Sequence, residues 1–588
     1  MTAEETRQII LEATRARGGH LASSLGAVEL ALALAEIFEP TKDRIVWDVG
    51  HQAYAWKIAT GRGERFATLR QLDGLAPFPN PAESPADAAV AGHAGSALSV
   101  ALGLAAARDA RGTSESVVAV VGDASMANGH SFEALNNCAA ETKKLIVVLN
   151  DNEMSISRPV GSLAKFLGRL ITNVRYNRVK KAAEAAGHRL RLTFLRGVYH
   201  RIESRIKGLF LGNRFFEQFG LRYIGPVDGH DLAALCAALT VAREDKRSVL
   251  VHVVTKKGCG YAPAERNPTK YHGVSPATFA EEEGASKPQA FDAIHNRPDW
   301  STVFGSLVTD LAKADGRVVA LTAGMKDGTG LTPFAEAHPT RFHDVGIAEG
   351  HLVGFAAGLA AGGLRPVVAV YSTFLQRAVD QVMHDVCISS LPVVFCVDRA
   401  GVVGADGVTH QGVFDLAMLR SLPNLTICQP CDGVEFKLML EAAVNRSGPT
   451  VIRYPRGRSP APRNVVGEGL AVPVANIRAP VQLWVTGDWL DKALDVAEKT
   501  GVGVVYARYL KPFDAELLAR QRAAGMTIVS LENGACAGGF GEAIGAEMRL
   551  GWPDAFIPHG SVAELERRYG LDVESVARRV ATLMNGRN

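Results

Sequence analysis

Residues 117–154 constrain the fold of this chain more than any other stretch, because they predict a strand, a helix and a second strand. The apolar run 117–121 predicts a buried strand, 130–141 a helix, and 145–149 another buried strand. Residues 122–125 are expected to form the turn after the first strand. Such a unit makes two parallel strands that end at the same edge of one sheet. That edge is where open α/β sheets bind ligands.

Two polar residues follow these strands, Asp123 after the first and Asn152 after the second. A carboxylate, an amide oxygen and a main-chain carbonyl make a hard oxygen site that suits Mg²⁺, with a diphosphate supplying further ligands. A Gly-Asp pair is more often only a turn. Here the turn Gly-Asp-Ala is followed by twenty-five residues (125–149) and then by Asn-Asp-Asn, a pattern similar to the motif of thiamine-diphosphate enzymes. The resemblance implies Mg²⁺ held by Asp123, Asn152 and the carbonyl of Met154, although Ala124 stands where that family has its second glycine.

Length and composition narrow the class of protein. A chain of 588 residues predicts several domains, because single cores stop growing near 250–300 residues. The net charge of +3 is small for this length and argues against nucleic acid as a partner. No apolar run is long enough for a membrane helix, no export signal is visible, and the eight cysteines are scattered. We therefore expect a cytoplasmic protein with no membrane partner.

Three histidines stand beside glycine at the ends of predicted elements, ahead of the central motif: His20, His51 and His93. One such histidine is more often structural than catalytic. Three together favour a functional role, because imidazole titrates near neutral pH.

Runs along essentially the whole chain resemble the 1-deoxy-D-xylulose-5-phosphate synthase family. They include Gly-His-Leu-Ala-Ser-Ser-Leu-Gly, Trp-Asp-Val-Gly-His-Gln-Ala-Tyr, Asn-Asp-Asn-Glu-Met-Ser-Ile-Ser and Tyr-Ile-Gly-Pro-Val-Asp-Gly-His-Asp. Further matching runs lie at 255–258, 344–351, 371–377, 404–412 and 453–457. The resemblance implies a transketolase-like fold of three consecutive α/β domains, each with a mostly parallel central sheet.

The domains are expected at 1–290 for diphosphate and Mg²⁺ binding, 291–462 for pyrimidine binding, and 463–588 as the C-terminal transketolase-like domain. A composition shift at 281–288 indicates the first linker. Within the first domain, a basic helical insertion is expected at about 157–215, where thirteen Lys or Arg between positions 165 and 214 face two acids. A solvated insertion near the mouth of the active site is the preferred interpretation. Contact with anionic lipids is the alternative.

A helix starting at Glu349 carries a glycine at every fourth position: Gly350, Gly354, Gly358 and Gly362. Glycine weakens a helix by roughly 1 kcal/mol against alanine, so a face of four indicates close approach of another backbone. We expect a tight domain contact or dimer contact, and therefore a homodimer.

The resemblance implies that thiamine diphosphate acts as an electron sink while pyruvate loses CO₂. The two-carbon unit then passes to D-glyceraldehyde 3-phosphate, giving 1-deoxy-D-xylulose 5-phosphate. Glu349 is expected to bond the aminopyrimidine, and His20, His51 and His410 to move protons. Residues expected to line the cofactor are His51, Gly92, His93, Ala94, Asp123, Ala124, Ser125, Asn152, Tyr261, Glu349 and Phe374. Residues expected to bind substrate are Tyr371, Arg377, Arg399, Asp406, His410 and Arg456, with Arg399 and Arg456 on the acceptor phosphate.

Three departures from the family pattern lie near the expected cofactor: Gly350 for glutamine, Ala124 for glycine, and residues 94–97 for a serine-rich run. Because of these departures, the alternative that the chain is a paralogue with a different aldehyde acceptor stays open. Two further alternatives are less favoured. One is a transketolase-type enzyme with a sugar-phosphate donor. The other is a non-catalytic paralogue that binds thiamine diphosphate, which is disfavoured because the acidic and histidine residues are retained.

Overall fold

The computed structural model describes residues 1–152, 161–162, 212–282, 297–463, 465 and 469–585. Two compact units are present: Met1–Leu69 with Leu75–Ala285, and Arg70–Gly74 with Ser286–Asn588. Met154, the predicted boundary at 290 and nearly all of the predicted basic insertion lie outside the described residues. No helix in the described ranges is long and apolar enough to cross a bilayer.

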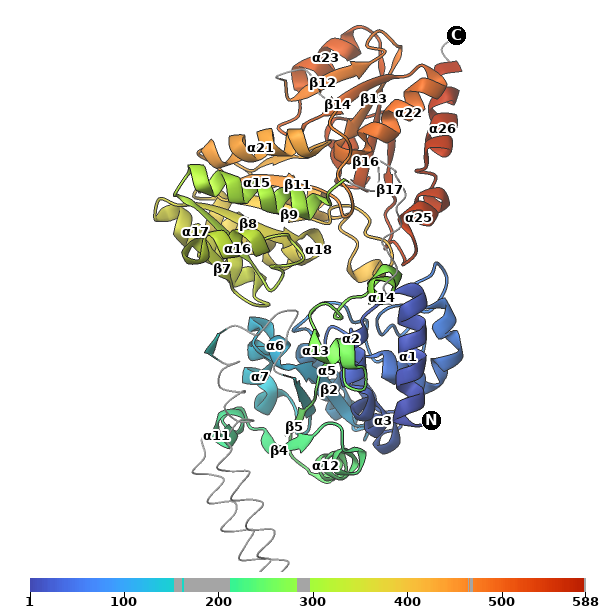
Figure 1. The fold of residues 1–588 in the computed structure, drawn as a ribbon, viewed down its shortest axis with the longest axis vertical. Helices are drawn as coiled ribbons and strands as arrows, with labels where there is room; N and C mark the ends of the chain where they lie inside the picture. The colour runs from blue at the N-terminus through green and yellow to red at the C-terminus, as the bar shows by residue number, and fades with distance from the viewer. Residues whose placement is uncertain (153–160, 163–211, 283–296, 464, 466–468, 586–588) are drawn as a thin grey trace, which may run out of the picture. The chain divides into compact units, whose positions relative to one another are not determined.

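The first unit is built on five parallel strands in the order β1-β2-β3-β5-β4 (Figure 1). Gly122 of β2 pairs with Asn150 of β3, so the predicted parallel strands do end at one edge. The strands are β1 (Arg44–Trp47), β2 (Val117–Gly122), β3 (Ile146–Asp151), β4 (Arg222–Asp228) and β5 (Val249–Val254). The helices are α1 (Ala3–Arg17), α2 (Leu21–Gly26), α3 (Val28–Ile37), α4 (Tyr54–Lys57), α5 (Ala97–Arg111), α6 (Asp123–Met126), α7 (Gly129–Glu141), α11 (Gly212–Glu217), α12 (Leu232–Glu244), α13 (Ala262–Arg266) and α14 (Pro276–Glu282).

Both faces of this sheet are covered by helices. Alternate residues of β2 point to opposite faces, because side chains alternate along a strand. Val118 and Val120 join the cluster that contains α3 and α12, whereas Ala119 and Val121 join the cluster that contains α5 and α7. This double coverage explains why the strands are continuous apolar runs.

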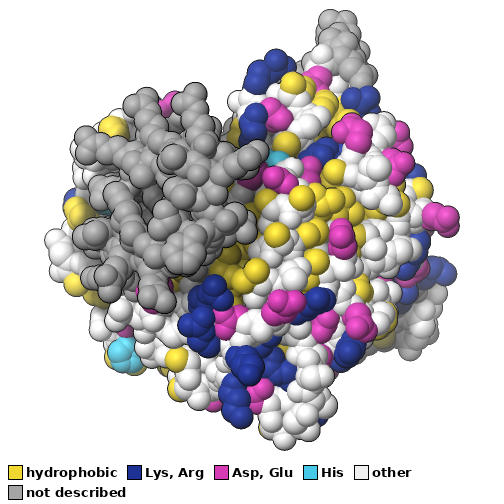
Figure 2. Space-filling view, turned by 90° about the horizontal axis from the view of Figure 1, so that it is seen from below, with side chains coloured by type: hydrophobic (Ala, Val, Ile, Leu, Met, Phe, Trp, Pro, Cys, Tyr) yellow, Lys and Arg dark blue, Asp and Glu magenta, His cyan; other side chains and the backbone are white. Residues whose placement is uncertain are grey.

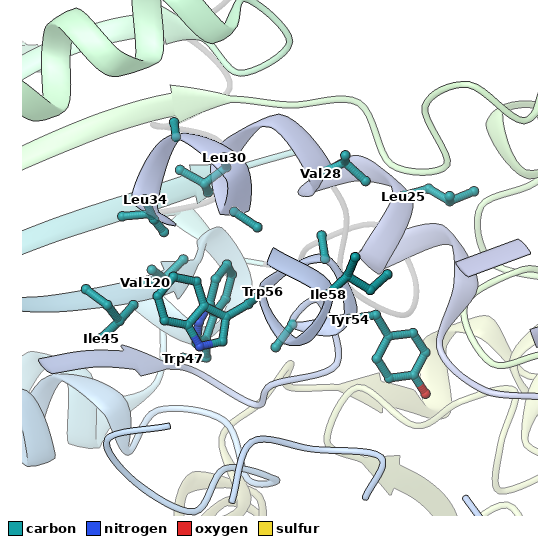
Figure 3. Packing of buried hydrophobic residues seen from close by; sticks show 14 of the residues in the cluster. Leu25, Val28, Leu30, Leu34, Ile45, Trp47, Tyr54, Trp56, Ile58 and Val120 are labelled. Atoms are coloured by element: carbon teal, nitrogen blue, oxygen red, sulfur yellow. The ribbon is translucent and has the colours of Figure 1, made fainter. Parts of the chain in front are cut away.

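The core beneath α3 also supports a predicted site residue (Figure 3). The indole rings of Trp47 and Trp56 lie 6.2 Å apart and share this core with Leu30 and Leu34 of α3 and with Val120 of β2. Tyr54, fully buried in the same cluster, accepts a hydrogen bond through its hydroxyl from the backbone N–H of His20 at 3.4 Å.

Two local predictions in this unit were wrong. The helix expected over 23–38 is interrupted at Ala27, whose ψ of 13° is not helical, which separates α2 from α3. Gly26 at the end of α2 lies so close to the chain at Lys256 that a Cβ would stand 3.0 Å from that carbonyl oxygen. The turn expected at 122–125 is instead the short helix α6, which begins at Asp123.

The second unit contains two sheets. The larger has the order β15-β10-β11-β9-β8-β6-β7 and is parallel except for β15. Its strands are β6 (Val318–Thr322), β7 (Phe342–Asp344), β8 (Arg365–Tyr371), β9 (Val394–Asp398), β10 (Thr426–Cys428), β11 (Thr450–Arg453) and β15 (Tyr509–Lys511). Its helices are α15 (Trp300–Ala314), α16 (Thr332–Ala337), α17 (Glu349–Ala361), α18 (Ser372–Leu375), α19 (Val379–Gln381), α20 (Asp415–Leu419) and α21 (Gly433–Asn445).

The other sheet has the order β12-β14-β13-β16-β17 and is parallel except for the β12–β14 pair. Its strands are β12 (Ala471–Ala475), β13 (Val481–Thr486), β14 (Gly503–Ala507), β16 (Thr527–Ala535) and β17 (Met548–Trp552). Its helices are α22 (Leu490–Thr500), α23 (Ala515–Ala523), α24 (Phe540–Ala543), α25 (Val562–Tyr569) and α26 (Val573–Asn585). One apolar cluster contains residues of both sheets, among them Val368 and Trp484. The three mostly parallel sheets agree with the predicted architecture, and the division at 290 and 462 stays a prediction.

Helix α17 begins at Glu349, as predicted. Its glycines do not meet another backbone in the described part of the chain. A Cβ on Gly358 would have no neighbour within 4 Å, and one on Gly354 would meet only the Asp385 carboxylate, at 3.4 Å. Within the described part of the second unit these glycines make no close backbone contact, and the predicted domain or dimer contact stays a prediction.

Candidate active site

The predicted residues fall into two groups, one in each unit. In the first unit, Asp123 occupies the first position of α6, where β2 ends, and is 7% exposed. Burial, helped by the charge of Asp151, raises the pKa of its carboxyl to about 8. The charge of Lys257 acts in the opposite direction, as do backbone N–H groups of α6. A cation beside Asp123 would favour the ionised carboxylate.

The three residues of the Asn-Asp-Asn motif differ in role. Asn150 is buried, donates to Gln52 at 2.6 Å and accepts from Thr255 at 2.7 Å, so it is structural. Asp151 is also buried and bonds Nε2 of His252 at 3.0 Å. Asn152 follows the strand and is partly exposed, which leaves it as the motif residue at the sheet edge.

His20 and His51 lie together, and a third histidine that sequence reasoning missed joins them. The ring centroids of His20 and His51 are 6.2 Å apart, and His272 lies 5.9 and 5.3 Å from them. Burial lowers the pKa of His51 and of His272 well below the usual value, and the neighbouring imidazoles and Lys257 lower them further. Both rings are therefore neutral at neutral pH. No spacing rule links positions 20, 51 and 272 in the sequence.

The turn that contains Gly92, His93 and Ala94 is fixed by Asp48. The Asp48 carboxylate accepts the backbone N–H groups of Gly95, at 2.9 and 3.0 Å, and of Ala97, at 3.1 Å, at the start of α5. Gly95 has a φ of +83°, and a Cβ there would lie 2.5 Å from the side chain of Asn128. This close approach joins the turn to the segment after α6 that follows Asp123.

Lys257 belongs to the matching run 255–258 but was not predicted as a site residue. Its charge nevertheless acts on Asp123, His51 and His272. It is 5% exposed, and burial lowers its pKa to about 8 while Asp123 opposes that shift. Tyr261, predicted to line the cofactor, has other contacts. Its hydroxyl bonds Glu282 at 2.6 Å and its ring packs edge-on against Tyr271.

In the second unit, Glu349 stands at the N-terminus of α17, beyond the carboxyl end of β7, and is 4% exposed. Burial raises the pKa of its carboxyl, opposed by the Arg377 guanidinium, whose Nε lies 3.5 Å from Glu349 Oε2. Arg377, expected among the substrate residues, thus lies against the predicted proton-handling carboxyl.

Tyr371 is the last residue of β8, and Arg399 directly follows the neighbouring strand β9. The Arg399 guanidinium lies over the Tyr371 ring, 3.8 Å from its centroid. Arg399 has a φ of +59°, an uncommon conformation for arginine that turns the chain sharply after β9. Beneath it, Asp398 is fully buried, accepts from Ser301 at 2.7 Å, and has a pKa raised to about 6 by burial.

Asp406 joins two further guanidinium groups. Its carboxylate lies 2.7 Å from Arg70 and 3.5 Å from Arg456. Burial lowers the pKa of Arg456, the charges of Arg399 and Arg70 lower it further, and the charge of Asp406 opposes both effects. We call Arg70, Arg399 and Arg456 the arginine cluster. Arg70 was not predicted, because nothing local to it indicates contact with residues 336 or more positions away.

His410 and Phe374 lie beside this cluster. The ring of Phe374 stacks on Tyr371 at 5.8 Å and meets His410 edge-on at 5.7 Å. Nδ1 of His410 lies 2.9 Å from the Thr409 hydroxyl. Glu349, Tyr371, Phe374, Arg399 and Asp406 thus end or follow β7, β8 and β9, at the carboxyl edge where such sheets bind ligands.

The described residues suit the two predicted cofactors in different degrees. Nδ1 of His51 is buried and has no hydrogen-bond partner among the described residues, which suits a bound polar group. Across the described ranges, no cluster of three or more His, Cys, Asp or Glu side chains has the geometry of a metal site. The predicted Mg²⁺ site needs only one carboxylate, because its other donors are an amide, a carbonyl and diphosphate oxygens.

Comparison with known families agrees with these observations. Residues 296–461 match the family model described as transketolase, pyrimidine binding domain, and residues 1–255 match the model described as 1-deoxy-D-xylulose-5-phosphate synthase. Together with the parallel sheets and polar strand ends, these matches define a transketolase-type thiamine-diphosphate enzyme.

Individual relatives place the chain more finely. The 1-deoxy-D-xylulose-5-phosphate synthase 2 of Geobacter sulfurreducens is 45% identical, covering 99% of this chain and 96% of the relative. The 1-deoxy-D-xylulose-5-phosphate synthase of Desulforudis audaxviator is 45% identical over 98% of this chain and 93% of the relative. A solved transketolase from Campylobacter jejuni is 18% identical, covers 99% of this chain and 98% of that chain, and has a TM-score of 0.45. The chain belongs to the 1-deoxy-D-xylulose-5-phosphate synthase family.

The predicted family, the transketolase-like α/β fold, the transferase class and dependence on thiamine diphosphate are thereby confirmed. None of these matches tests the individual site residues, Mg²⁺, the two substrates or the homodimer, so these stay predictions.

Proposed function

We propose that this protein decarboxylates pyruvate and transfers the two-carbon unit to D-glyceraldehyde 3-phosphate, giving 1-deoxy-D-xylulose 5-phosphate. Thiamine diphosphate, when bound, supplies the electron sink that the carbanion beside the carbonyl requires. Asp123, Asn152 and the Met154 carbonyl would hold the Mg²⁺ that anchors the diphosphate.

The chain's own residues divide the remaining work. Glu349 holds a proton at its buried carboxyl, because a raised pKa favours the shared or protonated form. His20, His51 and His410, with His272, would accept and return protons. The lowered pKa values of His51 and His272 keep those two rings neutral, so each has a nitrogen lone pair that can accept a hydrogen bond or a proton. Phe374 would pack against the pyrimidine.

The arginine cluster would bind the acceptor phosphate. Arginine forms charge-assisted, often bidentate bonds with phosphate, and here Asp406 preorganises two of the three guanidinium groups. The observation that carries the proposal is that Arg399, Arg456 and the buried Glu349 follow β9, β11 and β7 of one sheet, at its carboxyl edge.

The experiment measures pyruvate-dependent CO₂ release with phosphorylated and unphosphorylated aldehydes. Arg399→Ala and Arg456→Ala should each raise KM for D-glyceraldehyde 3-phosphate about 10- to 150-fold, because a lost charged hydrogen bond costs about 1.5–3 kcal/mol. KM for pyruvate should stay nearly unchanged. Arg446→Ala, which changes an exposed arginine ahead of the amino end of β11, is the matched control. An equal loss with the unphosphorylated aldehyde would mean that the cluster does not bind phosphate.

A homodimer is part of the proposal, with the glycine face of α17 as its contact.

The face drawn in Figure 2 carries Lys and Arg side chains interspersed with Asp and Glu. Together with the net charge of only +3, this mixture supports small-molecule substrates rather than nucleic acid as partners. The three functional domains at 1–290, 291–462 and 463–588 belong to the same proposal.

A further inference from the structure

The two segments that carry Arg399 and Arg456 are held by a strand of the other sheet in the second unit. Residues 399–413 form a loop closed by paired backbone bonds between Gly401 and Gly412, at 2.7 Å each. Beyond the short turn Gly407–Thr409, this loop has no regular structure to fix it. Its position must therefore come from tertiary contacts.

Those contacts come from the C-terminal sheet. The Asn533 side chain, near the end of β16, accepts the backbone N–H of Val402 at 3.3 Å. Two residues on, the N–H of Ala535 donates to the carbonyl of Val413 at 2.9 Å. Gln411 donates to the carbonyl of Pro558 at 3.0 Å while its own oxygen accepts the N–H of Val403 at 2.7 Å. The fit is tight, because a Cβ on Gly401 would lie 2.2 Å from the Asn533 side chain.

Asn533 also contacts the second arginine-bearing segment. Its backbone carbonyl accepts from the Arg453 guanidinium at 3.0 Å. Arg453 is 1% exposed and is otherwise held by Asp415, at 2.9 and 3.0 Å, and by Gln429 at 2.7 Å. It ends β11, three residues before Arg456, just as Val402 stands three residues after Arg399. One residue therefore bonds both the segment that carries Arg399 and the segment that carries Arg456.

We propose that Asn533 is a positioning residue that sets the spacing between Arg399 and Arg456, and hence selectivity for a phosphorylated acceptor. The inference rests on the proposed function of the arginine cluster. It gives the C-terminal sheet a part in substrate recognition, which its sequence did not indicate. Asn533 is 6% exposed, and its hydrogen bonds to Val402, Arg453 and Trp552 would let it act on the substrate through these arginines.

The test compares Asn533→Ala with Gln521→Ala. Both wild-type side chains are 6% exposed amides of the C-terminal domain that accept an indole N–H, Asn533 from Trp552 at 2.9 Å and Gln521 from Trp484 at 2.8 Å. Gln521 otherwise bonds Gln482, not the loop. Asn533→Ala should raise KM for D-glyceraldehyde 3-phosphate about tenfold, the size of one lost hydrogen bond, with kcat and KM for pyruvate nearly unchanged. Gln521→Ala should change only the thermal stability.

Asn533→Asp keeps the accepting oxygen and should restore most of the acceptor KM, which a purely structural role would not predict. If Asn533→Ala does not fold, Asn533→Ser, which retains a hydroxyl, should show a smaller rise of the same kind. An unchanged acceptor KM in a folded Asn533→Ala variant, or an equal rise in both KM values, would overturn the inference. If the wild type does not distinguish the phosphorylated from the unphosphorylated aldehyde, the proposed function of the arginine cluster fails instead.

Discussion

Glu349 combines two opposing influences at one position. A helix N-terminus favours a charged carboxylate, yet burial raises the carboxyl's pKa, and the net direction is upward. The residue therefore keeps its proton to a higher pH than an exposed glutamate does. This property separates a proton-handling residue from an ordinary helix cap.

We expect Glu349→Ala to leave the protein folded and able to bind thiamine diphosphate while decarboxylation falls at least about 100-fold, the lower end of general acid–base contributions. The measurement pairs CO₂ release with circular dichroism and cofactor titration. Near-normal turnover in a folded variant would remove Glu349 from the mechanism.

Asp398 predicts a pH dependence of stability. Its pKa is raised by burial from 3.8 to about 6, so the folded state binds its proton more tightly than the unfolded state does. The contribution of this group to stability is then lost as pH rises from about 4 to about 6, by roughly 3 kcal/mol. Urea unfolding should be measured for the wild type and for Asp398→Asn. The difference between their free energies of unfolding should change with pH across this range and stay constant above it. A difference that does not vary with pH would contradict the raised pKa.

At the scale of elements, α17 presents its glycines without a partner backbone in the described chain. Gly358→Leu should fold, since a Cβ at this position meets nothing within 4 Å, but should shift the protein from dimer to monomer. Sedimentation velocity measures the shift. Gly358→Ala is the graded control, expected to keep the dimer while strengthening the helix by up to about 1 kcal/mol. An unchanged oligomer in Gly358→Leu would remove α17 from the interface.

Elements near one another in the sequence could be predicted, and distant pairings could not. The apolar runs at 117–121 and 145–149 fixed β2 and β3, and their parallel order placed Asp123 and Asn152 at one edge. The same reasoning missed His272, Lys257 and Arg70, because each meets its partners only after remote segments pack. Strand β15 was missed for the same reason. Its three residues carry no signal until they pair with β10.

For the whole molecule, we expect cofactor and metal to stabilise the fold together. Thiamine diphosphate with Mg²⁺ at about 100 times the dissociation constant should add about 2.7 kcal/mol of stability, seen as a rise in Tm. Chelation with EDTA should return Tm to that of the protein without ligand, and added Mg²⁺ should restore it. Asp123→Asn, which keeps the shape but not the charge, should show no such rise. A full rise in that variant would exclude Asp123 as a ligand.

Strand β15 also limits where the boundaries of an expressed fragment of this polypeptide can be set. It is contributed by the chain after β14, yet it supplies the last strand of the larger sheet, antiparallel to β10. A fragment that stopped after β11 would leave the edge of β10 uncovered, and bare strand edges template aggregation. Domain-swap libraries and expression of isolated fragments should therefore treat everything from α15 to α26 as one exchangeable block, and should not divide it between its two sheets.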